Sequence, residues 1–270
     1  MLIRESSALI VEQTAIASLH LKRYVIVDIY LPRTASGITA PQVLLINDGQ
    51  DLEEMKFASL LDKQISSGAM QPVICVGIYA GKNRLQEYGV AGTLDYEGRG
   101  GLAAEYQRFI TEELLTELQQ RYGWETITGS AICGFSMGGL SALDTALNHP
   151  KIFSKAGVFS GSLWWRSQPL GEEYSDDLHR IIHQKVRSEP LAANLKFYFT
   201  TGSLDETEDR NNNGVIDSID DTQDLVNELR NKGLGNGRVT YINYPEGRHN
   251  VESWAKAMPA FLRWGWSERD

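Results

Sequence analysis

The run Gly134-Phe-Ser136-Met-Gly138 constrains the fold of this chain more than any other feature. An apolar stretch at 130–133 precedes it, and a stretch typical of a packed helix follows at 137–147. A serine between two glycines at such a junction is typical of a catalytic nucleophile, because the tight turn exposes the hydroxyl and small neighbours let the backbone pass. The free N–H groups at the start of the helix then face a developing oxyanion. This context favours a nucleophilic Ser136 over an ordinary serine in a turn.

Strands and helices are predicted to alternate along most of the chain. From residue 43 onward, the apolar patterns predict strands at 43–46, 72–78, 127–133, 156–160, 195–200 and 239–243, and helices at 52–66, 102–122, 137–147, 172–188, 221–232 and 252–265. Such alternation predicts a mostly parallel sheet with helices on both faces. Residues 7–18 and 21–31 predict a hairpin that forms the antiparallel edge of this sheet. We therefore expect a three-layer α/β-hydrolase fold in a single domain over residues 1–270.

Length, composition and charge exclude several classes of protein. A chain of 270 residues with 42% hydrophobic and 23% charged residues is ordinary for a globular domain with a large core. Its formal net charge of −9 argues against a nucleic acid partner, since a phosphate backbone attracts positive charge. No apolar run approaches the length of about 18 residues that a membrane span needs. Residues 1–7 lack a secretory signal, so a cytoplasmic location is expected, or a periplasmic or secreted one if a leader was trimmed.

A serine hydroxyl needs a base and an orienting acid, and in this fold the acid and then the histidine follow the serine along the chain. Among the five histidines, His249 follows the last predicted strand and precedes the last predicted helix, where the base of this fold belongs. The acid should follow the strand at 195–200, where Asp205, Glu206 and Asp209 are the candidates. Asp205 stands nearest to the strand end and is favoured, with Glu206 as the main alternative.

The segment 209–220 matches the twelve-residue calcium loop of an EF-hand. Oxygen-bearing side chains occupy positions 1, 3, 5, 9 and 12, a glycine occupies position 6, and position 7 would offer its backbone carbonyl. The predicted ligands are Asp209, Asn211, Asn213, Val215, Asp217 and Asp220. Position 12 is aspartate rather than glutamate, as in the dockerin variant that the loop resembles. A polar surface loop is the alternative interpretation.

A calcium ion (Ca²⁺) at this loop is expected to act structurally. Asp209, as the first ligand, is then not free to orient His249, which favours Asp205 as the acid. Because Asp205 lies four residues before Asp209, bound calcium is expected to hold the loop that carries the acid. Weak calcium sites fill only outside cells, which runs against the cytoplasmic expectation.

Short motifs between residue 24 and the end of the chain carry a family resemblance. They are Val27-Asp-Ile-Tyr-Leu-Pro32, Leu44-Leu-Ile-Asn-Asp48-Gly-Gln50, Asn83-Arg84-Leu-Gln-Glu87-Tyr88, Gly134-Phe-Ser-Met-Gly-Gly139, His149-Pro150, Phe159-Ser160-Gly-Ser162-Leu-Trp164-Trp165, Thr201-Gly202 and Gly247-Arg-His249. In these motifs the chain resembles the Putative esterase family of α/β-hydrolases. That group includes enterochelin esterase, S-formylglutathione hydrolase, feruloyl esterases and the mycolyltransferases.

The resemblance implies roles for five residues of the reaction centre. It implies Ser136 as nucleophile, His249 as base and Asp205 as acid. It also implies that the backbone N–H groups of Met137 and Gln50 hold the oxyanion. The calcium-like insertion is not part of the family's common pattern.

Three further residues are expected near the substrate. Trp164 and Trp165 follow a strand end and are candidates for the wall of the acyl or alcohol pocket, with core packing as the alternative. Arg84 is a candidate for binding an anionic substrate group. A structural ion pair of Arg84 with Glu87 or another acid is the alternative.

These features together favour a serine carboxylic ester hydrolase that acts on a small-molecule ester through an acyl-enzyme. The only cofactor expected is calcium, and no organic cofactor is expected. Acyl transfer to an alcohol uses the same residues and is the first alternative. A non-catalytic, calcium-stabilised binding module is the second, and the complete set of serine, acid and histidine argues against it.

Overall fold

A computed structural model describes residues 2–5, 8–35, 37–235 and 237–267 of the chain. These residues form a nine-stranded sheet in the order β1-β2-β3-β5-β4-β6-β7-β8-β9. The strands are β1 (Leu2–Glu5), β2 (Leu9–Ser18), β3 (Arg23–Pro32), β4 (Val43–Asn47), β5 (Ile74–Ile78), β6 (Ser130–Phe135), β7 (Phe153–Phe159), β8 (Lys196–Leu204) and β9 (Val239–Arg248). Neighbours from β1 to β5 pair antiparallel, and those from β5 through β4 to β9 pair parallel. The predicted fold, with its antiparallel edge, is confirmed.

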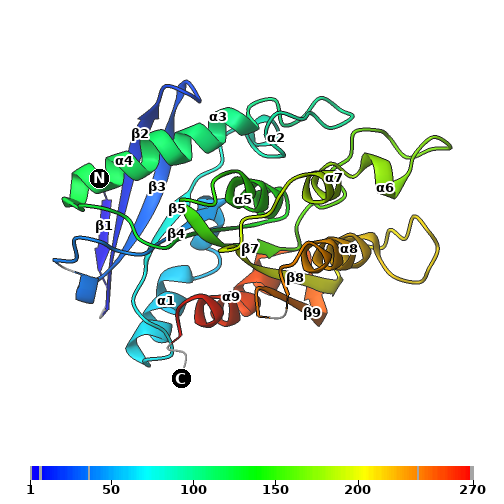
Figure 1. The fold of residues 1–270 in the computed structure, drawn as a ribbon. Helices are drawn as coiled ribbons and strands as arrows, with labels where there is room; N and C mark the ends of the chain where they lie inside the picture. The colour runs from blue at the N-terminus through cyan, green and yellow to red at the C-terminus, as the bar shows by residue number, and fades with distance from the viewer. Residues whose placement is uncertain (1, 6–7, 36, 236, 268–270) are drawn as a thin grey trace.

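Helices cover both faces of this sheet (Figure 1). On one face lie α1 (Phe57–Ser66) and α9 (Val251–Trp266). On the other lie α3 (Ala103–Arg108), α4 (Leu115–Tyr122), α5 (Met137–Asn148), α7 (Ile181–Ser188) and α8 (Asp217–Asn231), with a π-helical segment over Phe109–Leu114 between α3 and α4. The short helices α2 (Arg84–Glu87) and α6 (Asp176–His179) belong to the loops after β5 and β7.

The two cores explain why the central strands are apolar throughout. Leu44 and Ile46 of β4 pack beneath α1 and α9, whereas Leu45 packs against the opposite layer of helices. Both faces of a central parallel strand are thus buried, and each demands apolar side chains. Helix α5 is similarly enclosed, because every residue from Met137 to Ala146 is buried.

The predicted helix at 52–66 begins later than expected. Lys56 adopts the left-handed backbone conformation, with φ 54°, and α1 begins at the next residue. Before it, Gly49–Leu52 forms a short 3-10 turn, η2, after the left-handed Asp48. The apolar pattern did not separate these two turns, because left-handed positions outside glycine leave little trace in sequence.

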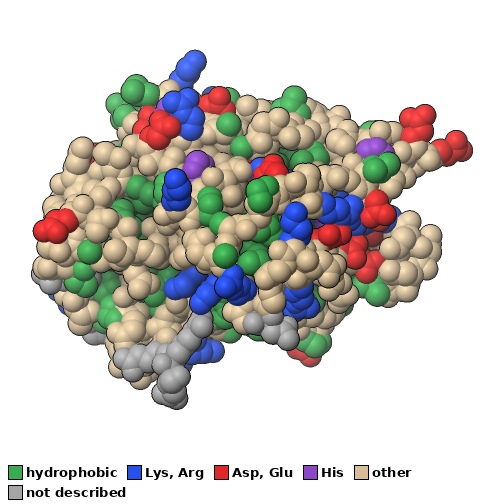
Figure 2. All heavy atoms as spheres, in the orientation of Figure 1, with side chains coloured by type: hydrophobic (Ala, Val, Ile, Leu, Met, Phe, Trp, Pro, Cys, Tyr) green, Lys and Arg blue, Asp and Glu red, His purple; other side chains and the backbone are tan. Residues whose placement is uncertain are grey.

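The predicted helix at 172–188 is divided into α6 and α7 by Arg180, whose backbone is extended. Its guanidinium is 2% exposed and forms ion pairs with Asp221 and Asp224 of α8, at 2.7 and 2.8 Å. Figure 2 shows basic and acidic side chains side by side in this region, over α7 and α8. The break therefore results from a contact with a distant helix, which local propensity does not reveal.

Two strands next to the predicted site continue beyond their predicted ends. β8 runs to Leu204 and β9 runs to Arg248, so the two remain paired at their carboxyl ends. This extension places the segments after both strands next to each other. The hairpin predicted at 7–18 and 21–31 corresponds to β2 and β3, and β1 adds an edge strand that was not predicted.

Candidate active site

The predicted catalytic residues gather at the carboxyl ends of the parallel strands. Gln50 follows β4, Ser136 follows β6, Asp205 follows β8 and His249 follows β9. Because these strands are parallel, their carboxyl ends form one edge of the sheet, where open α/β sheets bind ligands. The long loops after β5, β7 and β8 extend to the right-hand side of Figure 1. The structure thus brings the four residues to one edge.

Ser136 occupies a strained turn between β6 and α5. Its backbone has φ 53° and ψ −123°, a conformation that residues other than glycine rarely adopt. A β-carbon at Gly134 would lie 2.3 Å from the carbonyl oxygen of Gly138, so the turn requires its glycine there. Within 130–146, Ser136 is the one residue that is not buried. The turn therefore exposes this hydroxyl and keeps its neighbours in the core.

A second serine contacts the first. The Oγ atoms of Ser136 and Ser162 are 3.3 Å apart, and the backbone N–H of Ser162 donates to the carbonyl oxygen of Ser136 at 3.1 Å. Ser162 lies in the segment after β7 and is buried. The sequence alone indicates no role for Ser162, because its spacing from Ser136 follows no local rule.

The two candidate acids have different surroundings. Oδ2 of Asp205 accepts a hydrogen bond from the backbone N–H of Gly202 at 2.9 Å, whereas its buried Oδ1 has no partner. The carboxylate of Glu206 accepts from the backbone N–H of Ser218 in the first turn of α8. Burial raises the pKa of Glu206, and that N–H opposes the shift. Glu206 is thus engaged as a partner of a helix N-terminus, and Asp205 keeps an acceptor free.

The strand register places His249 beside Asp205. Leu204 of β8 pairs with Arg248 of β9, so Asp205 and His249 follow two paired residues. The imidazole lies edge-on to Trp254, with ring centroids 5.2 Å apart. Over the described residues no direct hydrogen bond joins His249 to Asp205 or to Ser136.

The surroundings of His249 lower the pKa of its imidazole. Desolvation lowers its pKa from the ordinary value of 6.5, the positive charge of Arg84 adds to this, and the negative charge of Asp205 opposes it. The imidazole keeps an exposed surface, so solvent can reach it despite this partial desolvation. The lowered pKa keeps the imidazole neutral, and therefore basic, at pH 7.

The turn that carries Gln50 is held from several sides. Asp48, with φ 59°, donates its backbone N–H to the hydroxyl of Tyr88 at 3.1 Å. Nδ2 of Asn47 donates to the carbonyl oxygen of Gly138 at 2.8 Å, which ties the end of β4 to the first turn of α5. The N–H groups at the starts of η2 and α5 thus lie on two segments that the Asn47 side chain joins.

Arg84 is part of this support. Its Nε and Nη2 atoms donate to the two carboxylate oxygens of Asp48, both at 2.7 Å. Glu87, the acid named among the possible partners, instead forms an ion pair with Arg23 at 2.6 Å. The structure therefore contains the alternative of a structural ion pair, with Asp48 as the acid, and this pair takes up two of the guanidinium nitrogens of Arg84.

The two tryptophans after β7 differ. Trp165 has no exposed surface and packs against the loop after β5, near Gly89 and Gly100. For Trp165, core packing is thus correct and the pocket wall is not. Trp164 is half-buried, and the guanidinium of Arg99 lies 5.3 Å from its ring centroid.

The predicted calcium loop contains convergent side chains. Asp209 accepts hydrogen bonds from the backbone N–H groups at positions 5 and 6, at 3.1 and 2.9 Å. The amides of Asn211 and Asn213 donate to Oδ2 of Asp220 at 3.0 and 2.6 Å. Helix α8 begins at Asp217, which is position 9, so position 12 stands in its first turn. Asp220 and the amides of Asn211 and Asn213 thus form one hydrogen-bonded cluster, and Asp209 binds the backbone of the same loop.

The remaining predicted ligands are arranged differently. Asp217 accepts from the backbone N–H of Arg210 at 2.9 Å and pairs with the Arg210 guanidinium at 3.1 Å. The backbone N–H of Val215 donates to Oδ1 of Asn213 at 2.8 Å. Across the described ranges, no group of three or more His, Cys, Asp or Glu side chains is placed to hold a metal. A metal here would depend on amide and backbone oxygens as well as carboxylates.

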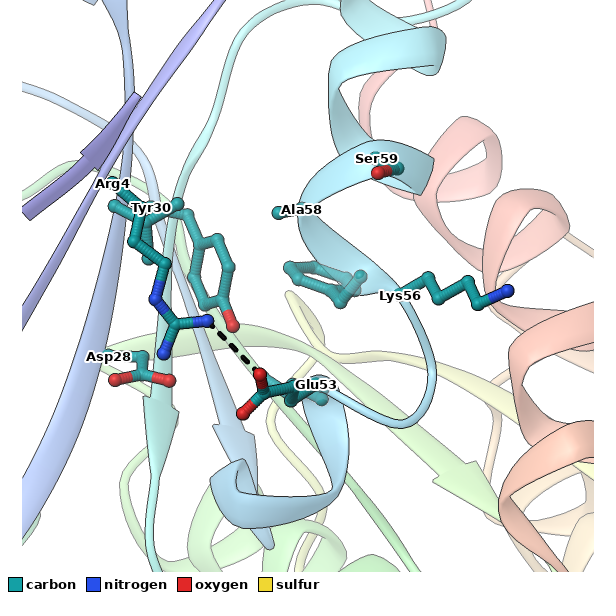
Figure 3. Close-up of a pocket in the computed structure, with 10 residues that line it drawn as sticks. Arg4, Asp28, Tyr30, Glu53, Lys56, Ala58 and Ser59 are labelled. Carbon is teal, nitrogen blue, oxygen red and sulfur yellow. Dashed lines mark hydrogen bonds and ion pairs between the residues drawn. The ribbon is translucent and has the colours of Figure 1, made fainter. Parts of the chain in front are cut away.

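A cavity of about 270 Å³ lies elsewhere, between α1 and the strands β1–β3. Figure 3 shows Arg4 and Glu53 facing each other across it, joined by an ion pair of 3.4 Å, with Asp28 and Tyr30 on the strand side. It adjoins η2 through Leu52, but none of the predicted catalytic residues lines it.

Comparison with known proteins identifies the family. Residues 18–264 match the family described as Putative esterase. The chain belongs to this family. One curated relative is the uncharacterized protein YbbA of Bacillus subtilis (strain 168), 26% identical over 145 residues, which are 52% of this chain and 57% of that protein. The chain thus matches little more than half of that relative's length.

Solved esterase structures share the fold of this family member. A ferulic acid esterase superposes with a TM-score of 0.69 and 18% identity, covering 95% of this chain and 97% of the other. The enterobactin esterase FES from Shigella flexneri has a TM-score of 0.70 and 18% identity, covering 94% and 58%. An IroE-like serine hydrolase from Shewanella oneidensis has a TM-score of 0.70 and 21% identity, covering 94% and 79%. At these identities the likeness shows the fold. Over the described ranges, no helix is both long and apolar enough to span a membrane.

Proposed function

We propose that this esterase-family protein hydrolyses small-molecule carboxylic esters through an acyl-enzyme on Ser136. The observation that carries the proposal is the backbone of Ser136, with φ 53° and ψ −123°, at a turn whose neighbours are buried. Strain of this kind persists only where the surrounding structure enforces it, and it clusters at functional sites. Here the strained backbone places the hydroxyl of Ser136 at the carboxyl edge of the sheet, next to the N-terminus of the buried helix α5.

In the proposed reaction, Oγ of Ser136 attacks the ester carbonyl while His249 accepts its proton. The imidazolium then gives that proton to the leaving alcohol. The second half-reaction repeats these steps with water, which frees the acid and restores the serine. Asp205 would orient and stabilise the imidazolium through Oδ1, the carboxylate oxygen that has no partner in the structure.

The oxyanion would be held by the backbone N–H groups of Met137 and Gln50. Met137 is the first residue of α5, where N–H groups have no partner inside the helix. Gln50 lies in η2, the turn held through Asp48 by Arg84 and Tyr88. Removing one such donor typically raises the barrier by about 2.7–4 kcal/mol. The ion pair of Arg84 would therefore contribute to catalysis by positioning a donor.

The test compares two serines that lie next to each other. Wild type, Ser136→Ala and Ser162→Ala are assayed with short p-nitrophenyl esters and labelled with a fluorophosphonate. We expect Ser136→Ala to lose both hydrolysis and the covalent adduct, and Ser162→Ala to keep the adduct. An adduct that depends on Ser162 instead, or equal hydrolysis by wild type and Ser136→Ala, would show that the nucleophile is assigned wrongly.

We also propose that the loop at 209–220 binds calcium structurally, through Asp209, Asn211, Asn213, Asp220 and the carbonyl of Val215. The contacts of Asn211 and Asn213 with Asp220, the folding of the loop backbone around Asp209 and the start of α8 at position 9 support this. Asp217, engaged by Arg210, would act through a water molecule, as position 9 often does. Calcium would neutralise the clustered carboxylates and order the segment after Asp205.

Calcium binding is measured by titration calorimetry on metal-free protein. The matched variants are Asp209→Ala, which removes the first ligand, and Glu208→Ala, which removes the same charge one residue earlier. We expect only Asp209→Ala to abolish binding and the accompanying rise in melting temperature. Metal-free wild type that neither binds calcium nor changes its melting temperature would contradict the proposal.

A further inference from the structure

Arg166 carries a positive charge that the rest of the described chain does not neutralise. Nearby guanidinium groups pair with carboxylates: Arg99 with Asp95 at 2.5 Å and Arg180 with Asp221 at 2.7 Å. For the guanidinium of Arg166, the described residues provide no hydrogen-bond or ion-pair partner, and its Nε is buried without an acceptor. A buried N–H without an acceptor is uncommon in a folded protein and calls for an explanation.

Aromatic rings surround this guanidinium. Its central carbon lies 5.1 Å from the ring centroid of Tyr96, 5.6 Å from that of Trp164 and 5.9 Å from that of Tyr174. All three rings are half-buried. Ring faces attract a cation, but they do not accept hydrogen bonds as an anion does, and they displace water from the sides they cover. An anion that meets the guanidinium here would be bound more strongly than at an open surface.

Arg166 lies close in the chain to a residue that contacts the proposed nucleophile. It lies four residues after Ser162, whose backbone and side chain both contact Ser136. Four residues span at most about 14 Å, so Arg166 is within reach of one end of a modest ester. Its carbonyl oxygen accepts a hydrogen bond from the backbone N–H of Tyr96 at 3.0 Å, which joins the loops after β5 and β7. The guanidinium thus belongs to the joint wall of these loops.

We infer that Arg166 binds an anionic group of the substrate, of which a carboxylate is the simplest case. The inference rests on the proposed ester hydrolysis and adds the substrate class: esters that carry a negative charge away from the scissile bond. It also transfers the anion-binding role, which the sequence suggested for Arg84, to a guanidinium that is free. Planar guanidinium donors suit a carboxylate, because two N–H groups can meet its two oxygens.

The test measures selectivity rather than activity alone. The p-nitrophenyl monoesters of succinic, glutaric and suberic acid are compared with those of butyric, valeric and octanoic acid, which have the same chains without the charge. We expect wild type to prefer the charged ester at one chain length. Arg166→Gln should lower that preference in kcat/KM about tenfold or more, mainly through KM, and Arg166→Lys should keep part of it.

Arg248→Gln is the matched control, because it removes an equal charge from an exposed position next to the same site. It should leave the preference unchanged. A role of Arg166 in packing alone would lower kcat/KM for charged and neutral esters alike, and that result would overturn the inference. A wild type without preference for any charged ester would also overturn it.

A binding measurement separates this inference from the proposed reaction. Titration calorimetry follows the binding of glutaramate and valeramide to Ser136→Ala and to Ser136→Ala/Arg166→Gln, without any need for catalysis. Tighter binding of glutaramate that disappears with Arg166 supports the subsite even if the nucleophile is wrong. Equal binding of the two amides in the presence of Arg166 refutes the subsite even if the esters are hydrolysed.

Discussion

Replacing Gly202 with alanine would test how the loops of the proposed acid and base are held together. Gly202 lies in β8 directly against Gly247 of β9. A β-carbon there would stand 2.3 Å from the carbonyl carbon and from the carbonyl oxygen of Gly247. Carbon atoms in contact are normally about 3.5–4.0 Å apart, so the two strand ends must separate by more than about 1 Å. The obstacle is backbone, which cannot rotate aside as a side chain can.

The separation acts directly on the proposed catalytic pair. Asp205 is anchored by its hydrogen bond to the N–H of Gly202, and His249 follows Gly247 by two residues. Misplacing a catalytic group by 1 Å costs about 100-fold in rate, and we expect kcat/KM of Gly202→Ala to fall by about that factor. Overpacking costs about 1–3 kcal/mol, which corresponds to a loss of about 2–10 °C in melting temperature for a domain of this size.

The assay combines p-nitrophenyl butyrate hydrolysis with thermal unfolding. Gly265→Ala in α9 is the control, because a β-carbon there has no atom within 4 Å and the helix accepts alanine. It should match wild type in kcat/KM and melt at the same or a slightly higher temperature, because alanine is favoured over glycine in a helix by up to about 1 kcal/mol. If Gly202→Ala kept kcat/KM within a factor of about two, the strand contact would not position the pair, and the reasoning would be refuted.

Further predictions concern the acid, the base and the positioning of the oxyanion turn. Asp205→Asn should lower kcat by about 10³–10⁴, because it removes the acid that orients His249. Glu206→Gln should instead lower mainly the melting temperature. Equal losses of kcat in the two variants would contradict the assignment of Asp205 as the acid. Because neutral His249 is the active form and its pKa is lowered, kcat/KM should stay constant around pH 7 and fall only as the pH drops through a value below 6.5. A pH profile with its acidic limb above 6.5 would be inconsistent with this. Arg84→Gln removes a positive charge that lowers the pKa of His249, so the acidic limb of the profile should move to higher pH. The same variant loses the ion pair with Asp48, which should lower kcat by about tenfold. An unchanged kcat would argue against a positioning role.

The junction at Ser136 could be predicted from the sequence because its determinants are local. Two glycines, an apolar strand and an apolar helix lie within a short run, and each of these patterns favours one local structure. The edge reached by Gln50, Asp205 and His249 was also predictable, since alternating strands and helices run parallel and end on the same side. What the sequence order could not show was the register that places Leu204 opposite Arg248.

The contacts of single charged side chains were less predictable. Glu87 lies near Arg84 in sequence, but Arg84 pairs with Asp48, which is 36 residues away. Arg180 interrupts a helical pattern in order to reach Asp221 in another helix. Such partners depend on the packing of distant elements, and no local spacing indicates them. The free guanidinium of Arg166 could be recognised only once the partners of its neighbours were known.

The enclosure of α5 limits how this protein can change over evolution. A helix without a solvent-facing side offers no position from Met137 to Ala146 where a substitution is inconsequential. New substrate preferences must therefore arise in the exposed parts of the loops after β5 and β7, since Arg84, Tyr88 and Ser162 in the same loops already hold the proposed site. A library of variants should show this as a sharp contrast, with almost no tolerated changes along α5 and many at the exposed positions of those two loops.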